Sequence, residues 1–112
     1  MTLERGQIWM MDAGPRAPEG RAVLVIQAQA LLDAEHPTAL VVPLSTHTVS
    51  DAAPLRVRIP AIGRLKRETD AMIDQLRPVD IRTLIKGPLA KVSAALLESV
   101  GEAVRDVLDV SA

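Results

Sequence analysis

Glu19-Gly20-Arg21-Ala22-Val23-Leu24-Val25-Ile26-Gln27, residues 19–27, sets one arginine directly before a run of five apolar residues. A run this short, rich in valine and preceded by glycine and proline, favours a buried strand, which we expect at Val23–Gln27. Such a strand is a rigid support for the residue that directly precedes it. The Arg21 guanidinium is always charged and carries five donors in a planar fork, which suits it to phosphate. A solvated surface ion pair is the alternative interpretation.

Three further segments have the composition of strands. Continuous apolar runs predict strands at residues 7–11 and 39–44. Residues 55–59 alternate strictly between apolar and basic side chains, which is typical of a strand with one wet face. Arg56 and Arg58 should therefore lie side by side on a solvated strand face.

The segments around these strands are shorter or are interrupted by prolines and glycines. Residues 28–38 favour a helix by their alanine and leucine, but Pro37 limits them to one turn or an irregular link. Residues 71–77 predict another strand, which Pro78 should end. Asp80 can cap one helical turn through Leu84. A short last strand is expected near residue 89.

The clearest helix begins after Ser93, which is a good N-cap. Its apolar residues recur at three- and four-residue spacing and form one stripe: Leu96, Val100, Ala103, Val104 and Val107. This stripe should dock on the sheet or barrel.

Five or more short strands and few helices predict a mainly β protein with α additions, as a small barrel or sandwich. The strands at 23–27 and 39–44 are apolar on both faces. Cover must therefore come from the helix or from a second subunit. A chain of 112 residues is long enough for one compact domain, and we expect residues 1–112 to form it.

The composition excludes several classes of site. Cysteine is absent, so there is no disulfide framework and no thiolate site. Trp9 is the only aromatic residue, which counts against binding single strands by base stacking. His36 and His47 are too far apart in the sequence for a local metal-binding motif. A Ser-His-Asp catalytic triad could be drawn from Ser45, His47 and an aspartate, but such triads depend on geometry and not on proximity in sequence. We see no Gly-rich phosphate loop.

Charge is distributed unevenly along the chain. The net charge is −1, but residues 51–91 hold nine basic and five acidic side chains. Such a basic middle third can steer anionic ligands despite the neutral total. We see no secretory signal and no apolar run long enough to span a bilayer, so a cytoplasmic protein is expected.

Four segments, in this order, resemble motifs of the MazF/PemK family of toxin endoribonucleases. They are Arg5-Gly6-Gln7-Ile8-Trp9, Gly20-Arg21-Ala22-Val23-Leu24-Val25-Ile26, Val41-Val42-Pro43-Leu44-Ser45-Thr46, and Asp74-Gln75-Leu76-Arg77 followed by Val79-Asp80. Their order and spacing hold across nearly the whole chain, including the closing amphipathic helix. The resemblance implies an SH3-like barrel that dimerises, and a small antitoxin with an acidic tail (MazE-like) as partner.

The resemblance also implies an activity, namely metal-independent cleavage of single-stranded RNA to a 2′,3′-cyclic phosphate and a 5′-hydroxyl, with no cofactor. The family's catalytic arginine and threonine map onto Arg21 and onto Ser45, with Thr46 adjacent. Serine replaces the family's threonine, and either hydroxyl can face the site. Ala22 stands where proline commonly follows the arginine, and Pro78 stands where threonine is usual.

Three other side chains are candidates for RNA contact. They are Arg16, in the loop before Arg21, together with Gln75 and Arg77. Gln75 has the donor and acceptor needed to read a base edge, although a buried amide satisfied by backbone is an alternative. One competing function is that of CcdB-like toxins, which share the barrel and inhibit DNA gyrase without nuclease chemistry. That group uses a C-terminal Trp-Gly-Ile, whereas this chain ends Asp109-Val110-Ser111-Ala112. Another is that of a barrel without catalysis that only binds its antitoxin.

Overall fold

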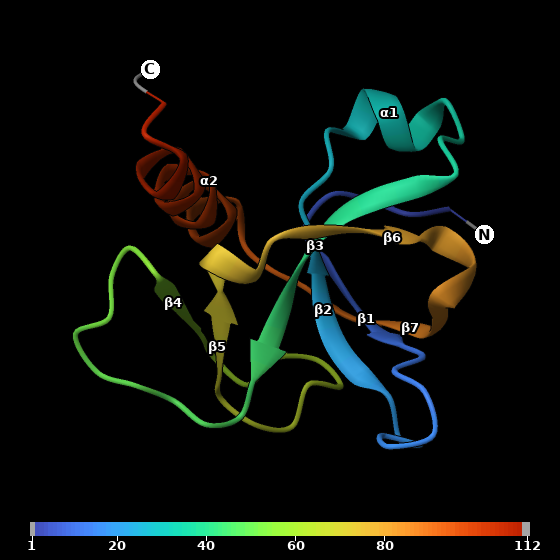
Figure 1. The fold of residues 1–112 in the computed structure, drawn as a ribbon, viewed down its shortest axis with the longest axis horizontal. Coiled ribbons are helices and arrows are strands. Elements are labelled where there is room, and N and C mark those ends of the chain that lie inside the picture. Colours follow the sequence, from blue (N-terminus) through green and yellow to red (C-terminus); the bar gives the residue numbers. More distant parts are fainter. Residues whose placement is uncertain (1, 111–112) are drawn as a thin grey trace.

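Antiparallel strand pairing dominates the computed structural model, which describes residues 2–110 (Figure 1). Within that range, seven strands pair in the order β4-β5-β3-β2-β1-β7, and β6 also pairs with β3. The strands are β1 (Gln7–Met11), β2 (Arg21–Val25), β3 (Thr38–Ser45), β4 (Arg56–Ile59), β5 (Thr69–Met72), β6 (Arg77–Asp80) and β7 (Leu84–Lys91). The helical elements are α1 (Gln29–Asp33), α2 (Ala94–Leu108) and two 3-10 turns, η1 (Ile73–Gln75) and η2 (Ile81–Thr83).

The sheet is open between β4 and β7, its two outer strands. No strand pair joins them within residues 2–110. Instead, the loop between β4 and β5 reaches β7, where the Arg64 backbone N–H donates to the Leu89 carbonyl over 2.7 Å. The predicted mainly β fold with a C-terminal helix is therefore confirmed, and its sheet is open rather than closed into a barrel.

Both faces of the central strands are covered by the chain itself. Neighbouring strand residues point to opposite faces, so Leu24 packs in one cluster while Val23 and Val25 pack in another. The first cluster is closed by buried residues of α2, and the second by partly buried side chains of α1, β6 and η2. Apolar residues on both faces of β2 are therefore consistent with burial inside one chain.

Helix α2 follows the pattern that the sequence predicted. The Ser93 hydroxyl accepts from the Leu96 backbone N–H at 3.1 Å, which makes Ser93 the N-cap. Val100 and Ala103 are buried on the face that packs against the sheet and η1. Figure 1 shows α2 lying beside β4 and η1. The predicted apolar stripe is the docking surface.

The segment from 69 to 80 differs from the prediction of one strand at 71–77. β5 pairs with the end of β3, as in Ser45↔Asp70, and β6 pairs with the same strand further back, as in Val41↔Arg77. The 3-10 turn η1 separates the two and buries Ile73. Pro78 does not end a strand but lies within β6. A residue without an N–H is tolerated there because β6 lies at an edge of the sheet.

The remaining boundaries need smaller corrections. β2 begins at Arg21 itself, so the arginine is the first residue of the strand rather than a residue before it. The strand expected near residue 89 is the longer β7. Residues 28–38 contain the short helix α1, and the Asp80 carboxylate caps η2 by accepting from the Arg82 N–H. Both of those predictions are confirmed.

Gly20 sets the entry of the chain into β2. Its φ is +84°, and a Cβ added there would lie 2.7 Å from the Met11 carbonyl oxygen. No L side chain fits this backbone without displacing the start of β2 or the end of β1. The close approach of Gly20 to β1 therefore determines where Arg21 is held.

Gly20→Ala should lower the free energy of unfolding by about 1–3 kcal/mol, because the left-handed backbone and the contact with Met11 are both unfavourable. Gly14→Ala is the matched control, since Gly14 has nearly the same φ of +85° but open space around its Cβ position. Urea unfolding of both variants measures the difference. Equal losses would show that the contact with Met11 is unimportant.

Candidate functional site

The pairing of β2 with β3 brings the predicted catalytic residues together at one end of these two central strands. The strands pair in the antiparallel register Val23↔Pro43 and Leu24↔Val42. This pairing ends at Val23↔Pro43, beyond which Arg21 and Ser45 lie at the neighbouring ends of the two strands. Arg21 is exposed at the start of its strand, and Ser45 is the last residue of β3.

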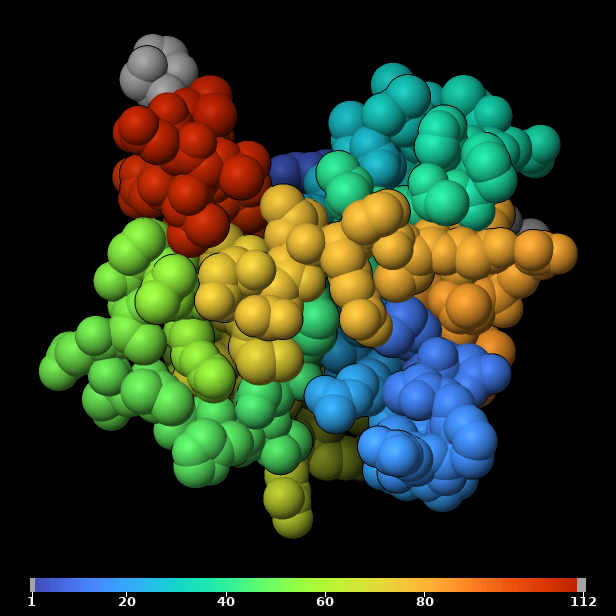
Figure 2. Space-filling model, viewed as in Figure 1, coloured from blue at the N-terminus to red at the C-terminus, as the bar shows by residue number. Residues whose placement is uncertain are grey.

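A hollow of about 480 Å³ opens at these strand ends, and Arg21, Ser45 and Thr46 all border it. Figure 2 shows a recess between the end of β3 and the start of β2, with the loop between β4 and β5 behind it. Five of its lining residues are apolar: Met10, Ala22, Leu44, Leu65 and Leu89. Apolar surroundings strengthen the electrostatic contacts that charged lining residues make to a ligand.

The hydroxyls of Ser45, at the end of β3, and of Thr46, directly after it, have different surroundings. The Ser45 hydroxyl accepts from the His47 N–H at 3.1 Å and donates to the His47 carbonyl at 3.4 Å. Thr46 is exposed, and its hydroxyl bonds no other residue in the range 2–110. Ser45 therefore shapes the turn, while the Thr46 hydroxyl is available to a ligand. The contact between Ser45 and His47 runs through the backbone, so these two residues do not form a nucleophile–base pair.

Three basic residues on the loop between β4 and β5 were not predicted as site residues. Arg64, Lys66 and Arg67 border the same hollow as Arg21. In the described part of the chain none of these four cations forms an ion pair, and Glu19 is the one carboxylate on the lining. The basic run Arg64–Arg67 was the available signal, but only the fold shows that it faces β2.

Backbone contacts hold this basic loop in place. Besides its N–H bond to Leu89, Arg64 donates from Nη2 to the Pro88 carbonyl at 2.6 Å. Gly63 lies so close to β7 that an added Cβ would be 2.6 Å from the Leu89 oxygen. The loop is therefore fixed to β7, and its cations stay beside the hollow.

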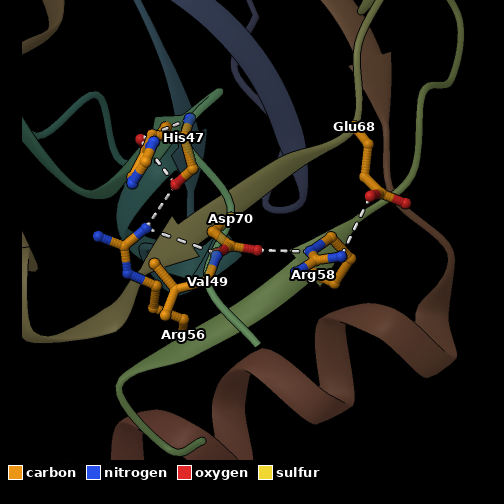
Figure 3. A network of polar contacts seen from close by, with 7 residues as sticks. His47, Val49, Arg56, Arg58, Glu68 and Asp70 are labelled. Atoms are coloured by element: carbon orange, nitrogen blue, oxygen red, sulfur yellow. Dashed lines mark hydrogen bonds and ion pairs between the residues drawn. The ribbon is translucent and has the colours of Figure 1, made fainter. Parts of the chain in front are cut away.

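Asp70 joins the two loops that flank the hollow (Figure 3). Its side chain is 1% exposed, and it accepts from Arg58 Nε at 2.6 Å and from the Val49 N–H at 2.7 Å. Arg56 lies 3.5 Å from Asp70 and donates to the His47 carbonyl at 2.9 Å. These bonds fix the loop that follows Ser45.

Arg58 extends the same network to the second loop through Glu68, at 3.1 Å. The side chains of Arg56 and Arg58 are 25% and 41% exposed, as expected for a solvated strand face, but both also bond to a buried carboxylate. Burial raises the pKa of Asp70 and is the largest single influence, yet the bonds from Arg58, Val49 and Arg56 together lower it below its ordinary value. The bond to Asp70 also raises the pKa of Arg58.

The residues predicted to contact RNA lie outside the lining of the hollow. Arg16 is exposed in the loop between β1 and β2, and Gln75 is exposed on η1, so Gln75 is not a buried amide. Arg77 starts β6 opposite Val41, four residues from Ser45 along β3 and so roughly 13 Å away. These three side chains can touch only the flanks of a ligand held in the hollow.

Residues 2–110 contain neither a cluster of metal ligands nor a membrane-spanning helix. No group of three or more His, Asp or Glu side chains lies close enough together to hold a metal ion. Within the same range, no helix has both the length and the apolar character needed to cross a membrane.

The fold and the hollow define a small antiparallel β protein with a cationic cleft at the ends of its central strands. The family model for the PemK-like, MazF-like toxin of type II toxin-antitoxin systems matches residues 4–108, so the chain belongs to this family. Nothing in the search of curated proteins matched.

Solved structures with the same fold are similar over nearly their full length. The Mycobacterium tuberculosis toxin MazF-mt6 is 15% identical, with a TM-score of 0.78 and coverage of 95% of this chain and 99% of that one. A MazE-MazF structure from Deinococcus radiodurans is 19% identical at a TM-score of 0.76, covering 99% and 100%. A mycobacterial endoribonuclease in complex with its cognate antitoxin is 18% identical at 0.76, covering 98% of each chain. At these identities the likeness establishes the fold.

Asp70→Asn should lower the free energy of unfolding by about 1–3 kcal/mol at pH 7, because charge-assisted bonds to a buried group are lost. The folded-state pKa of Asp70 lies below the unfolded value of about 3.9. Ionised Asp70 therefore stabilises the fold above that pH, and the contribution is lost as pH falls through the folded pKa. Chemical unfolding between pH 7 and about pH 2.5 should show the two proteins converging below about pH 4.

Asp74→Asn is the control, since Asp74 is an exposed carboxylate without an ion pair to any described residue. It should change stability little at any pH. A difference between wild type and Asp70→Asn that stays constant down to about pH 2.5 would mean that the carboxylate charge does not stabilise the fold.

Proposed function

We propose that this toxin is an endoribonuclease that cleaves single-stranded RNA in the hollow at the ends of β2 and β3, with residues 1–112 acting as one toxin domain. The observation that carries the proposal is the convergence of Arg21, the hydroxyls of Ser45 and Thr46, and three further cations on one cleft. A phosphodiester is the anion that such a cleft suits, because planar guanidinium groups bind phosphate through paired hydrogen bonds. The mycobacterial relative described as an endoribonuclease supports the same activity.

The reaction is an internal transfer within the RNA. The 2′-oxygen attacks the adjacent phosphorus and forms the O2′–P bond, and the P–O5′ bond breaks. The proton leaves the 2′-hydroxyl and a proton is delivered to O5′, so the products are a 2′,3′-cyclic phosphate and a 5′-hydroxyl. No water is consumed in this step. What the protein must supply is alignment and neutralisation of the charge that develops on the phosphate oxygens.

Arg21 supplies the charge neutralisation. It is exposed at a strand end and is not paired with a carboxylate in the described residues, so its donors are available to two phosphate oxygens. A guanidinium stays protonated at neutral pH and is a poor proton carrier. Glu19 is the lining group that can accept the 2′-hydroxyl proton. The roles of charge stabilisation and proton transfer therefore fall on different residues.

A hydroxyl at the end of β3 aligns the phosphate, and we assign this role to Thr46, the residue directly after the strand. Its hydroxyl borders the hollow and makes no bond to the described residues, whereas that of Ser45 is engaged with His47. Ser45 remains part of the site as the residue that shapes the turn under Thr46. Both residues are needed, but only one hydroxyl reaches the phosphate.

The rest of the RNA is held mainly through its backbone. Arg64, Lys66 and Arg67 extend the cationic surface from Arg21, and no aromatic platform exists in this chain beyond the buried Trp9. Binding should therefore depend on phosphate contacts more than on stacking. The outlying Arg16, Gln75 and Arg77 are proposed to contact flanking nucleotides, where hydrogen bonds to base edges select the sequence that is cut.

The proposed regulator is a MazE-like antitoxin, as in the Deinococcus radiodurans and mycobacterial complexes. An acidic tail would fit the four cations of the hollow and exclude RNA by charge and by volume. A homodimer is proposed by family resemblance and is tested by the mass of the purified protein in solution. Removal of the acidic residues of the partner should abolish its protection of RNA.

Arg21→Ala should reduce cleavage of a single-stranded RNA by at least about 100-fold, because the main charge-stabilising group is lost. Thr46→Val should also reduce kcat by about 100-fold, and Ser45→Ala should have a smaller effect. Arg82→Ala is the control, since Arg82 is exposed and pairs with Asp80 on η2. Initial rates with labelled RNA in EDTA, together with circular dichroism, measure activity and folding.

The outcomes separate the candidate functions. Cleavage at a near wild-type rate by Arg21→Ala would remove Arg21 from the mechanism, and a larger loss in Ser45→Ala than in Thr46→Val would transfer the aligning role to Ser45. Inhibition of DNA gyrase by a wild-type protein that leaves RNA intact would support the CcdB-like function instead.

Lys66→Ala/Arg67→Ala should weaken RNA binding and flatten its salt dependence, because both cations border the hollow and neither is paired in the described residues. For single strands the slope of log K against log salt changes by about 0.7 per lost phosphate contact, so about 1.4 is expected. Fluorescence anisotropy with a 2′-deoxy oligonucleotide, from 50 to 200 mM salt, measures this slope. An unchanged slope would place the RNA away from this loop.

A further inference from the structure

Thr69 is a buried polar residue with an unexplained hydroxyl. It is the first residue of β5, 2% exposed, and it borders the same hollow as Arg21 and Thr46. Among residues 2–110, its Oγ1 is the one fully buried side-chain nitrogen or oxygen that has no hydrogen-bond partner. Buried hydroxyls are bonded in nearly all proteins, so each exception calls for an explanation.

The unpaired hydroxyl is unfavourable for folding. Valine has nearly the same shape as threonine, suits a strand equally well and carries no polar atom that needs a partner. Thr69 lies on β5 opposite Ile59, where an apolar side chain would be the stable choice. The stability of the fold therefore does not explain a hydroxyl at this position, and a role in binding a ligand does.

The sheet register places Thr69 beside the proposed reacting group. β5 pairs with β3 as Leu44↔Ala71 and Ser45↔Asp70. Thr46 and Thr69 directly follow and precede the last of these pairs, and both residues border the hollow. Side chains alternate along β5, so Thr69 points away from the Asp70 network. Two threonines thus border the hollow together with Leu44.

We propose that Thr69 is an additional RNA-binding residue whose hydroxyl donates to an oxygen of the phosphate held by Arg21 and Thr46. The inference rests on the proposed function, because it takes the ligand of the hollow to be RNA. In the unliganded protein the oxygen is screened from solvent. Rotation about the Thr69 Cα–Cβ bond, or a shift of a lining side chain, brings it into the hollow when RNA binds. The bond is therefore made in the complex and missing in the free protein.

Two substitutions at this position separate RNA binding from folding. Thr69→Val removes the hydroxyl and keeps the shape, so Tm should rise while kcat/KM for RNA falls by about 10-fold or more. Thr69→Ser keeps the hydroxyl and loses a buried methyl group, so Tm should fall while kcat/KM stays within about 3-fold of wild type. A structural role alone would move activity and stability in the same direction.

The same proteins are titrated with a 2′-deoxy oligonucleotide that cannot be cleaved. Thr69→Val should bind it about 10-fold more weakly than wild type, and Thr69→Ser about equally. Wild-type activity or affinity in Thr69→Val would overturn the proposal, and so would a lower Tm, which would show that the hydroxyl already has a partner. If the wild-type protein binds the oligonucleotide without cleaving RNA, the proposed function fails and the affinities alone decide the role of Thr69.

Discussion

The antiparallel register between β2 and β3 is the constraint on which the site depends. It sets Val23 against Pro43 and so brings the start of β2, at Arg21, and the end of β3, at Ser45, to the same end of the sheet. A slip of one residue would turn every side chain of β2 to the opposite face. The two apolar clusters prevent this, since Leu24 is fully buried in one and Val23 and Val25 are fully buried in the other. Core packing on both faces of one strand thus fixes the place of a charged group at its end.

The loops on either side of the hollow are attached to this frame by polar contacts. Asp70 bonds to the loop after β3 through Val49, and reaches the loop before β5 through Arg58 and Glu68. Arg64 fixes the latter loop to β7. Loops held in this way keep cations in place before a ligand arrives, which lowers the entropy cost of binding. Rigid strand ends and tethered loops together form a preorganised cleft.

Local patterns in the sequence were sufficient for the elements that they encode directly. The stripe after Ser93, the apolar run of β1 and the alternation in β4 each predicted an element that the structure contains. The pairing of Arg21 with a hydroxyl after β3 came from a resemblance that spans the chain. Arg21, Ser45 and Thr46 border one hollow in the structure.

Features that depend on distant contacts could not be predicted in this way. The interruption of residues 71–77 by η1 arises because Ile73 is buried against α2, which lies far along the sequence. The sequence gives no sign that Asp70 differs from other strand residues. Its role depends on the pairing of β4 with β5, which places Arg58 beside it. In the sequence, the basic run after Gly63 has the composition of a solvated loop. In the structure, the bond from Arg64 to Leu89 holds this loop beside the hollow that Arg21 also borders. In each case the partner that gives the residue its role is more than ten positions away.

The central claim is that Arg21 and Thr46 hold the same phosphate. It is tested most directly by a crystal structure of the protein with an RNA that carries a single 2′-deoxy nucleotide at the cleavage site. The account predicts that oxygens of the phosphate after that nucleotide lie about 3 Å from the Arg21 guanidinium and from the Thr46 hydroxyl. A scissile phosphate bound elsewhere on the protein, with both side chains free of it, would contradict the account.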